Sequence, residues 1–165
     1  MEYRINRRTG DKISILGIGT SALPLAGERE AIAALRLAYE KGHRKIAFIH
    51  GEDTSVTRTR LQSFRAACSE LELSIPEAYL RPALYHDRKS AAREAKALLA
   101  LEETPTCILF QDDYSCIGGL DLLRRDGVTL PENLSYAGYD GIKLAQLFTP
   151  RLTTYRQDIS VMGQE

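Results

Sequence analysis

Apolar residues recur along the chain in two alternating patterns, short uninterrupted runs and longer stretches with a helical period. The short runs occupy residues 45–50 (KIAFIH), 106–111 (TCILFQ) and 134–139 (LSYAGY), and two further strand-like segments lie at 12–18 and 78–84. Near-continuous apolar runs are typical of strands that are covered on both faces, as in parallel sheets. The pattern therefore predicts a sheet whose inner strands are buried on both sides.

Between these runs, apolar residues recur at steps of three and four. Helices are predicted at 28–41, 58–73, 88–101 and 115–125, and Gly42 follows the first of them as a C-cap signal. Strands that alternate with helices in this way indicate an α/β fold with a doubly wound parallel sheet and right-handed crossovers.

Composition indicates a globular chain of about one domain. It has 165 residues, 44% of them hydrophobic, and 22 basic residues balance 22 acidic ones. A formal charge of zero argues against a nucleic-acid-binding module, which needs a clustered basic surface. The cysteines, Cys68, Cys107 and Cys116, lie in apolar patterns without metal or redox spacing. They are predicted to pack as small hydrophobic residues.

The two ends of the chain bear on location and completeness. The opening residues, MEYRINRRTGDK, lack the apolar region of a signal peptide, and no run approaches the roughly 20 apolar residues of a membrane helix. We therefore expect a cytoplasmic protein with no membrane partner. The chain opens on one strand without visible partners and ends on the amphipathic segment RQDISVMGQE. From this we expect a fragment of a longer protein.

Acidic residues follow four of the predicted strands. In chain order they are Glu52 and Asp53, Asp87, Asp112 and Asp113, and Asp140. The carboxyl ends of parallel strands form the edge at which ligands bind in open α/β sheets. Each carboxylate could also cap the next helix, the interpretation we favour for Asp113 and for Asp53 or Thr54. Carboxylates gathered at one rim would, however, repel one another unless a counter-charge or a hydroxyl-rich ligand relieved them.

One arginine is placed to meet these carboxylates. Arg60 lies in the first turns of the helix predicted at 58–73, and a planar guanidinium suits bidentate contacts to sugar hydroxyls or carboxylates. Tyr85, Tyr114 and Tyr139 add aromatic neighbours. This combination predicts a pocket for a polyol or a sugar rather than for a phosphate.

Two other motifs would indicate different chemistry. The G-x-G-x-x-A pattern at 17–22 matches a dinucleotide fingerprint, but Pro24 and Gly27 separate it from the helix which that motif requires. Asp112 and Asp113 could hold Mg²⁺ in a phospho-receiver, but no lysine directly follows the last strand. No nucleophile–base pair completes a catalytic site either. We therefore expect no enzymatic activity, no cofactor and no metal.

Longer motifs resemble a known family. The segments GHRKIAFIHG and TRLQSFRAAC are similar to GHRxIAFIxG and RxxGFxxAL of lactose-repressor-type (LacI/GalR) transcription regulators. A second block begins PTCILFQDDYSCIGG and continues through ENLSYAGYDG to PRLTTYRQ. It is similar to the family's P-T-A-I-x-x-x-N-D, S-V-x-G-F-D-D and P-x-L-T-T-x-x-Q. The resemblance extends from about Gly42 to the end of the chain.

This resemblance implies a type I periplasmic-binding-protein-like fold, in which two α/β subdomains close on a small ligand. Residues 1–42 would end the N-terminal subdomain, 43–155 would form the C-terminal effector-binding subdomain, and 156–165 would begin the crossover back. The effector would be a sugar, a polyol or a nucleobase, and the protein would act as a homodimer. Operator DNA would bind only through a helix-turn-helix domain that is absent from this chain.

The family's ligand contacts carry over position by position. Arg60 matches the effector-binding arginine, Asp140 matches the first aspartate of G-F-D-D, and Asp112 stands where the family has asparagine. A carboxylate only accepts hydrogen bonds, whereas an amide also donates them. We expect Asp112 to point into the effector crevice and Asp113 to cap the helix. The expected ligand-binding residues are Arg60, Asp112, Asp140, Gln157, Thr54 and Phe64.

Three functions are compatible with these features. The first is the effector-sensing part of a LacI/GalR-type regulator, which we favour. The second is a sugar solute-binding protein of the same fold, against which the missing signal peptide speaks. The third is an aspartate-based flavodoxin-like enzyme or phospho-receiver, which only the acidic rim supports.

Overall fold

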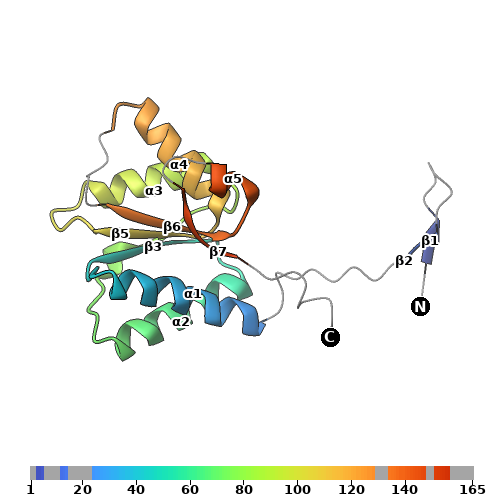
Figure 1. The fold of residues 1–165 in the computed structure, drawn as a ribbon, viewed down its shortest axis with the longest axis horizontal. Helices are drawn as coiled ribbons and strands as arrows, with labels where there is room; N and C mark the ends of the chain where they lie inside the picture. The colour runs from blue at the N-terminus through green and yellow to red at the C-terminus, as the bar shows by residue number, and fades with distance from the viewer. Residues whose placement is uncertain (1–2, 6–11, 15–23, 129–133, 148–150, 157–165) are drawn as a thin grey trace.

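The structure, a computed structural model of the chain, describes residues 3–5, 12–14, 24–128, 134–147 and 151–156. Helices and strands alternate along most of it (Figure 1). The strands are β1 (Tyr3–Ile5), β2 (Lys12–Ser14), β3 (Ile46–His50), β4 (Leu80–Pro82), β5 (Cys107–Phe110), β6 (Ser135–Asp140) and β7 (Thr153–Arg156). The helices are α1 (Pro24–Glu40), α2 (Ser55–Glu70), α3 (Arg88–Leu99), α4 (Asp113–Arg125) and α5 (Lys143–Leu147), with a short 3₁₀ helix at Glu77–Tyr79.

The main sheet has five parallel strands in the order β4-β3-β5-β6-β7. The chain runs outward from β3 to β4 and then returns past β3 to β5, so the strand order reverses between β3 and β5. The doubly wound parallel sheet predicted from the sequence is confirmed. Its β4-β3-β5-β6-β7 order is the flavodoxin-like variant, in which the reversal between β3 and β5 forms the crevice.

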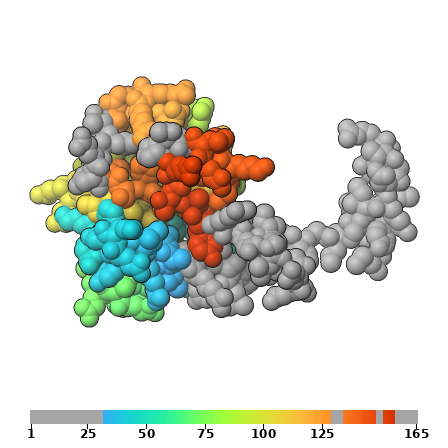
Figure 2. Space-filling model, viewed as in Figure 1, coloured from blue at the N-terminus to red at the C-terminus, as the bar shows by residue number. Residues whose placement is uncertain are grey.

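Helices cover both faces of this sheet. α1 packs against α2 on one face, and α3 packs against α4 on the other (Figure 1). In the space-filling view α1, in blue, and α4, in orange, lie on opposite sides of the molecule (Figure 2). All of α1 falls within residues 1–42, the range that we expected to end the N-terminal subdomain, yet the helix packs on this sheet. The division into subdomains stays a prediction.

Alternate residues of the inner strands supply the two halves of the core. In β3, Ile46 and Phe48 pack with α1 and α2, whereas Ala47 and Ile49 pack with α3 and α4. All four are at most 5% exposed. Strands with this burial need apolar residues at every position, which explains the uninterrupted runs in the sequence.

The cysteines belong to this core. Cys68, Cys107 and Cys116 are free and buried. Burial raises the pKa of Cys68 to about 11 and that of Cys107 to about 12, and thiols with a raised pKa are poor nucleophiles. Their predicted role as small packing residues is confirmed.

The end of α1 shows why Gly42 is needed. Gly42 has a φ of +93°, and the His43 N–H donates to the carbonyl of Ala38 at 3.0 Å. This is the left-handed helix end that glycine adopts most easily. The C-cap predicted at Gly42 is confirmed.

The N-terminal part of the prediction is wrong in two respects. Lys12–Ser14 pairs antiparallel with Tyr3–Ile5 instead of starting the parallel sheet, and 15–18 lie outside the described residues. Pairing two segments that are close in sequence closes only a short loop, which favours a hairpin. In addition, α1 begins at Pro24 and not near Glu28, because proline is well tolerated in the first turn of a helix.

Other boundaries also differ from the prediction. The strand expected at 78–84 is only Leu80–Pro82, preceded by the 3₁₀ helix. Pro82 cannot donate a backbone hydrogen bond, and this strand accordingly lies at the edge of the sheet. The strand β7 and the helix α5 were not predicted. Among the described residues, no helix is long and apolar enough to cross a membrane.

Candidate functional site

The loops that follow β3, β4, β5 and β6 meet at the carboxyl edge of the sheet, where the strand order reverses. Such a reversal leaves a crevice outside the strand ends, in which open α/β sheets bind ligands. A cavity of about 350 Å³ lies at this edge. It is lined by Thr54, Val56, Arg60, Tyr85, His86, Gln111, Asp112 and Asp140.

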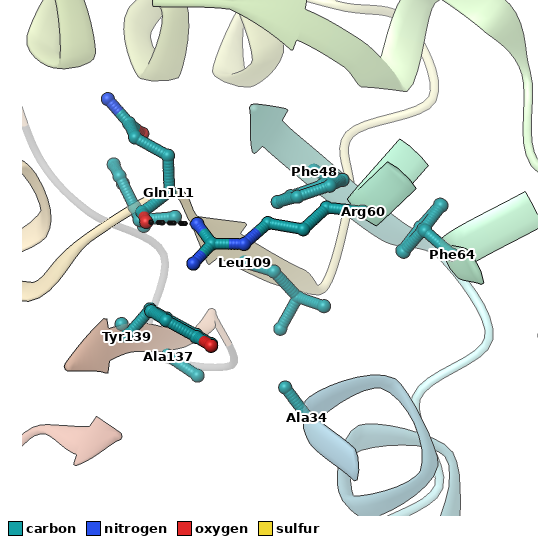
Figure 3. A pocket seen from close by; sticks show the side chains of 10 residues that line it. Ala34, Phe48, Arg60, Phe64, Leu109, Gln111, Ala137 and Tyr139 are labelled. Atoms are coloured by element: carbon teal, nitrogen blue, oxygen red, sulfur yellow. Dashed lines mark hydrogen bonds between the residues drawn. The ribbon is translucent and has the colours of Figure 1, made fainter. Parts of the chain in front are cut away.

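Arg60 is held between strand ends by hydrogen bonds and an aromatic ring. Its Nη1 donates to the carbonyl oxygen of Gln111 at 3.3 Å and to the hydroxyl of Tyr85 at 3.4 Å. Its guanidinium carbon lies 4.0 Å from the centroid of the Tyr139 ring (Figure 3). No carboxylate among the described residues forms an ion pair with Arg60. The guanidinium is therefore positioned while its charge is left for a ligand.

Thr54 begins the network that supports Arg60. Its Oγ1 accepts a hydrogen bond from the Thr57 N–H at 3.1 Å and caps α2, which confirms the cap predicted at Asp53 or Thr54. The Thr57 hydroxyl in turn lies 3.1 Å from the Tyr85 hydroxyl, which accepts from Arg60. Thr54 also lines the cavity. One threonine thus both starts the helix and forms part of the cavity wall.

Phe64 lies beneath the site and not in it. It is 1% exposed, and its ring packs 5.2 Å from that of Phe48, measured between centroids. With Arg60 it lines a separate space of about 20 Å³, mostly apolar, under the guanidinium (Figure 3). Residues four apart lie on the same face of a helix, so Phe64 packs under Arg60. Gln157, the other ligand contact expected from the sequence, lies outside the described residues.

The helix cap expected at Asp113 is instead supplied by Asp112. Asp112 is the N-cap of α4, and its Oδ1 accepts from the Ser115 N–H at 2.7 Å. Its Oδ2 accepts from the Ser115 hydroxyl at 2.8 Å and from the His86 N–H at 3.0 Å. The side chain is only 2% exposed. Asp112 still lines the cavity, but most of its hydrogen-bonding capacity is used within the protein.

Replacing Asp112 with asparagine is expected to lower the free energy of unfolding by about 1 kcal/mol. An amide has only one oxygen to accept from the three donors that Asp112 serves, and its N–H₂ group would face a buried donor. Asp87→Asn is the matched control. Asp87 caps α3 through the Ser90 N–H, and asparagine caps helices as well as aspartate does. Urea unfolding measures both variants, and equal effects would contradict this role for Asp112.

Asp113 lies behind the cavity and joins α4 to the segment after β6. It is fully buried, and its Oδ2 accepts a hydrogen bond from the Ile142 N–H at 2.9 Å. Burial raises the pKa of Asp113, although hydrogen bonds from Thr154 and from the backbone after β6 act in the opposite direction. Its place is structural, and the interpretation of Asp113 as the helix cap is wrong.

Asp140 faces the cavity from the end of β6. Its φ is +112°, an uncommon value for a residue other than glycine. Burial, with smaller contributions from Asp112 and Asp113, raises the pKa of Asp140 to about 6, although Arg60 and His86 oppose the shift. Strained backbone and a perturbed carboxyl in a crevice are features of functional sites.

The raised pKa predicts how Asp140 affects stability. Above pH 6 the folded state carries a carboxylate that it disfavours, whereas below the ordinary pKa of 3.8 the group is protonated in both states. The destabilisation therefore grows as the pH rises from about 4 to about 6. At about 1.4 kcal/mol per pKa unit, reduced for partial exposure, Asp140→Asn should stabilise the fold by about 1 to 2 kcal/mol at pH 7. The gain should vanish at pH 4.

Thermal unfolding at these two pH values measures this effect. Asn and Asp tolerate positive φ to a similar degree, so the substitution adds no backbone strain. Asp126→Asn, at an exposed position after α4, serves as the control and should change little at either pH. A pH-independent effect of Asp140→Asn would contradict the assignment.

Four other residues line the cavity without having been expected as ligand contacts, namely Val56, Tyr85, His86 and Gln111. Tyr85 and His86 directly follow the strand predicted at 78–84, and Gln111 ends the strand predicted at 106–111. Their place at strand ends was the signal that the sequence offered. Tyr114, named with Tyr85 and Tyr139 as an aromatic neighbour, is 47% exposed and does not line the cavity. Within the described ranges, no three His, Cys, Asp or Glu side chains gather as a metal site.

Comparisons with known proteins identify the family of this domain. A sequence profile of the periplasmic binding protein-like domain matches residues 35–165. The chain is 30% identical over 138 residues to the HTH-type transcriptional repressor PurR of Vibrio cholerae, and 30% identical over 136 residues to the HTH-type transcriptional repressor CytR of Escherichia coli. These alignments cover 83% and 82% of the chain but only 41% and 40% of the relatives. The chain thus spans less than half the length of these proteins.

Solved structures show the same arrangement. A regulatory protein of the LacI family from Chloroflexus aggregans has a TM-score of 0.74 and 28% identity, over 83% of this chain and 50% of that one. A LacI transcriptional regulator from a Rhodococcus species has a TM-score of 0.71 and 30% identity, over 84% and 51% of the two chains.

Proposed function

Because the chain belongs to the periplasmic binding protein-like domain family, as part of an effector-binding domain of the LacI/GalR type, we propose that it senses a small ligand for a transcription regulator. The ligand is sugar-like and binds in the cavity at the ends of β3 and β5. One observation carries this proposal. Arg60 and Asp140 face the same cavity at the reversal of strand order, and no described carboxylate pairs with Arg60.

The cavity offers the groups that a sugar or polyol needs. A guanidinium donates to hydroxyl oxygens in a fixed fork, and a carboxylate accepts from hydroxyl hydrogens. Arg60 and Asp140 supply these opposite functions, and Tyr85 adds an apolar ring at the wall. A nucleobase or another polyol is served by the same donors and acceptors.

Control of DNA binding would follow from closure around the ligand. A ligand shifts an equilibrium between two conformations only as far as it binds them with different affinity. Similarity to repressors that are named HTH-type supports a separate DNA-binding domain as the receiver of this shift. The formal charge of zero also supports DNA binding by a separate domain, because DNA binding requires a basic surface. Such a regulator works in the cytoplasm, where its operator is.

A homodimer would transmit the shift to a two-fold operator. Two leucines of α5 support a contact with a second copy, because Leu144 is 46% exposed and Leu147 is 80% exposed. Exposed apolar side chains that form a contiguous patch mark a surface that contacts another molecule.

We further propose that the domain has no catalytic role. Asp112 and Asp113, the pair that a phospho-receiver would need, accept hydrogen bonds from Ser115, His86 and Ile142. Asp112 keeps little free hydrogen-bonding capacity, and the Asp113 Oδ1, which has no partner among the described residues, is buried beside Gly138 and does not line the cavity. Neither carboxylate is therefore placed to hold a metal ion or to take up a phosphoryl group.

A thermal-shift screen of the complete polypeptide against sugars, polyols and nucleobases tests the proposal. At a concentration of about 100 times Kd, a ligand should add about 2.7 kcal/mol to the stability of the folded state. This gain should fall by about half or more in Arg60→Ala and in Asp140→Ala. No shift with any ligand, or equal shifts in the variants, would overturn the effector assignment.

A further inference from the structure

We propose that the effector carries a protonated amine beside its hydroxyl groups, as an amino sugar or an amino polyol does. This inference rests on the proposed function and narrows the class of ligand for the same cavity. It follows from the charge and from the unused hydrogen-bonding groups of the cavity wall.

The wall of the cavity is acidic. Asp112 and Asp140 each contribute one negative charge and Arg60 contributes one positive charge, which leaves one negative charge when His86 is counted as neutral. Asp113 adds a third carboxylate directly behind the wall. The carboxylates of the wall would stabilise a positive charge on a bound ligand and destabilise a negative one. A cationic ligand is therefore favoured over a neutral one and strongly favoured over an anion.

In the part of the chain that the structure describes, the cavity wall holds one unused buried donor, the Arg60 Nε, and one unused buried acceptor, the Gln111 Oε1, in addition to the Asp140 carboxylate. Gln111 is 1% exposed, and its Nε2 donates to the Leu84 carbonyl at 2.9 Å, but its Oε1 has no partner among the described residues. A buried acceptor without a donor destabilises the fold, so a ligand that donates to it gains affinity. The Asp140 carboxylate also has no ion-pair partner among the described side chains.

The one cation of the wall is already engaged with neutral groups. Arg60 donates to the Gln111 carbonyl and the Tyr85 hydroxyl and lies over the Tyr139 ring. These contacts hold it away from an ion pair with either aspartate, so its charge offsets the acidic side of the cavity only in part. An ammonium group, with three donors and no acceptor, matches that side. Hydroxyls on the same ligand can then meet Arg60.

Isothermal titration of the complete polypeptide at neutral pH tests this inference with matched hexoses. For each of the gluco, galacto and manno rings, the free amine, its N-acetyl derivative and the parent sugar are compared. The ring that binds should do so about 10-fold or more tightly as the amine, because acetylation removes the charge and a charge-assisted hydrogen bond. Equal or tighter binding of the parent sugar or of its 6-phosphate would overturn the inference and leave the proposed function standing.

Variants separate charge recognition from general loss of binding. Asp140→Asn should bring the ratio of amine to parent-sugar affinity close to one, and Arg60→Ala should weaken both ligands together. Asp126→Asn, exposed and remote from the cavity wall, should keep the ratio unchanged. A ratio that survives Asp140→Asn would contradict the role of the carboxylate. If no hexose and no ligand of the wider screen binds at all, the proposed function itself fails.

Discussion

Replacing Arg60 with alanine is expected to weaken binding of the effector by about 10- to 100-fold, the range that follows from losing one or two hydrogen bonds from a charged donor. The reason is geometric. The guanidinium enters the cavity from α2, and Gln111, Tyr85 and Tyr139 fix its orientation. An arginine held in place before binding loses little side-chain freedom when the ligand arrives.

Arg65→Ala provides the matched control for this variant. Arg65 lies on the same helix, but its side chain is 55% exposed and pairs with Glu77 at 2.9 Å. It should bind the effector as the unmodified protein does. Arg60→Lys keeps the charge but lacks the planar fork, so an intermediate affinity is expected. Titration calorimetry gives the dissociation constants of the three variants. Similar losses of affinity in Arg60→Ala and Arg65→Ala would contradict a specific role for Arg60.

Replacing Gly138 with alanine is expected to lower the free energy of unfolding by about 1 to 3 kcal/mol, as overpacking of a full core does. A Cβ at this position of β6 would clash with the Asp113 Oδ1 and would lie 3.0 Å from the Asp113 Cα and from a Leu152 methyl group. Asp113 is fully buried and bonded to Ile142. The carboxylate therefore has no free space into which it could move.

A double-mutant cycle tests the cause of this loss. Asp113→Ala alone should destabilise the fold by removing the acceptor for the Ile142 N–H. When Asp113→Ala is combined with Gly138→Ala, the two losses of stability should be less than additive. Asp113→Ala removes the carboxylate oxygen with which the new methyl group collides. Urea unfolding supplies the four free energies. Strict additivity would show that the strain at Gly138 has another source.

The layers of the fold could be predicted from the sequence because strands that are buried on both faces have a recognisable apolar pattern. Residues 46–49 of β3 and all of β5 are apolar, since alternate residues pack on opposite helix layers. β7 lacks this apolar pattern. It lies at the edge of the sheet with the polar sequence TTYR, and only its pairing with β6 makes it a strand.

The site could be predicted less completely, and Asp112 and Asp113 show the physical reason. Both are aspartates next to a helix start, so local chemistry permits either one to be the cap. The choice depends on partners far along the chain, the His86 N–H for Asp112 and the Ile142 N–H for Asp113. Likewise, Phe64 occupies a position next to the arginine motif, but its direction on α2 places it in the core. Tertiary partners, not spacing, decide these roles.

The central claim is that the ligand binds at the carboxyl edge between β3 and β5, on Arg60 and Asp140. A crystal structure of the complete polypeptide with the ligand found by the screen tests it most directly. We predict ligand oxygen or nitrogen atoms within hydrogen-bond distance, about 3 Å, of the Arg60 guanidinium and the Asp140 carboxylate. A ligand seated instead in the separate groove of about 140 Å³ beside α1, lined by residues such as Leu37, His43 and Thr153, would contradict it.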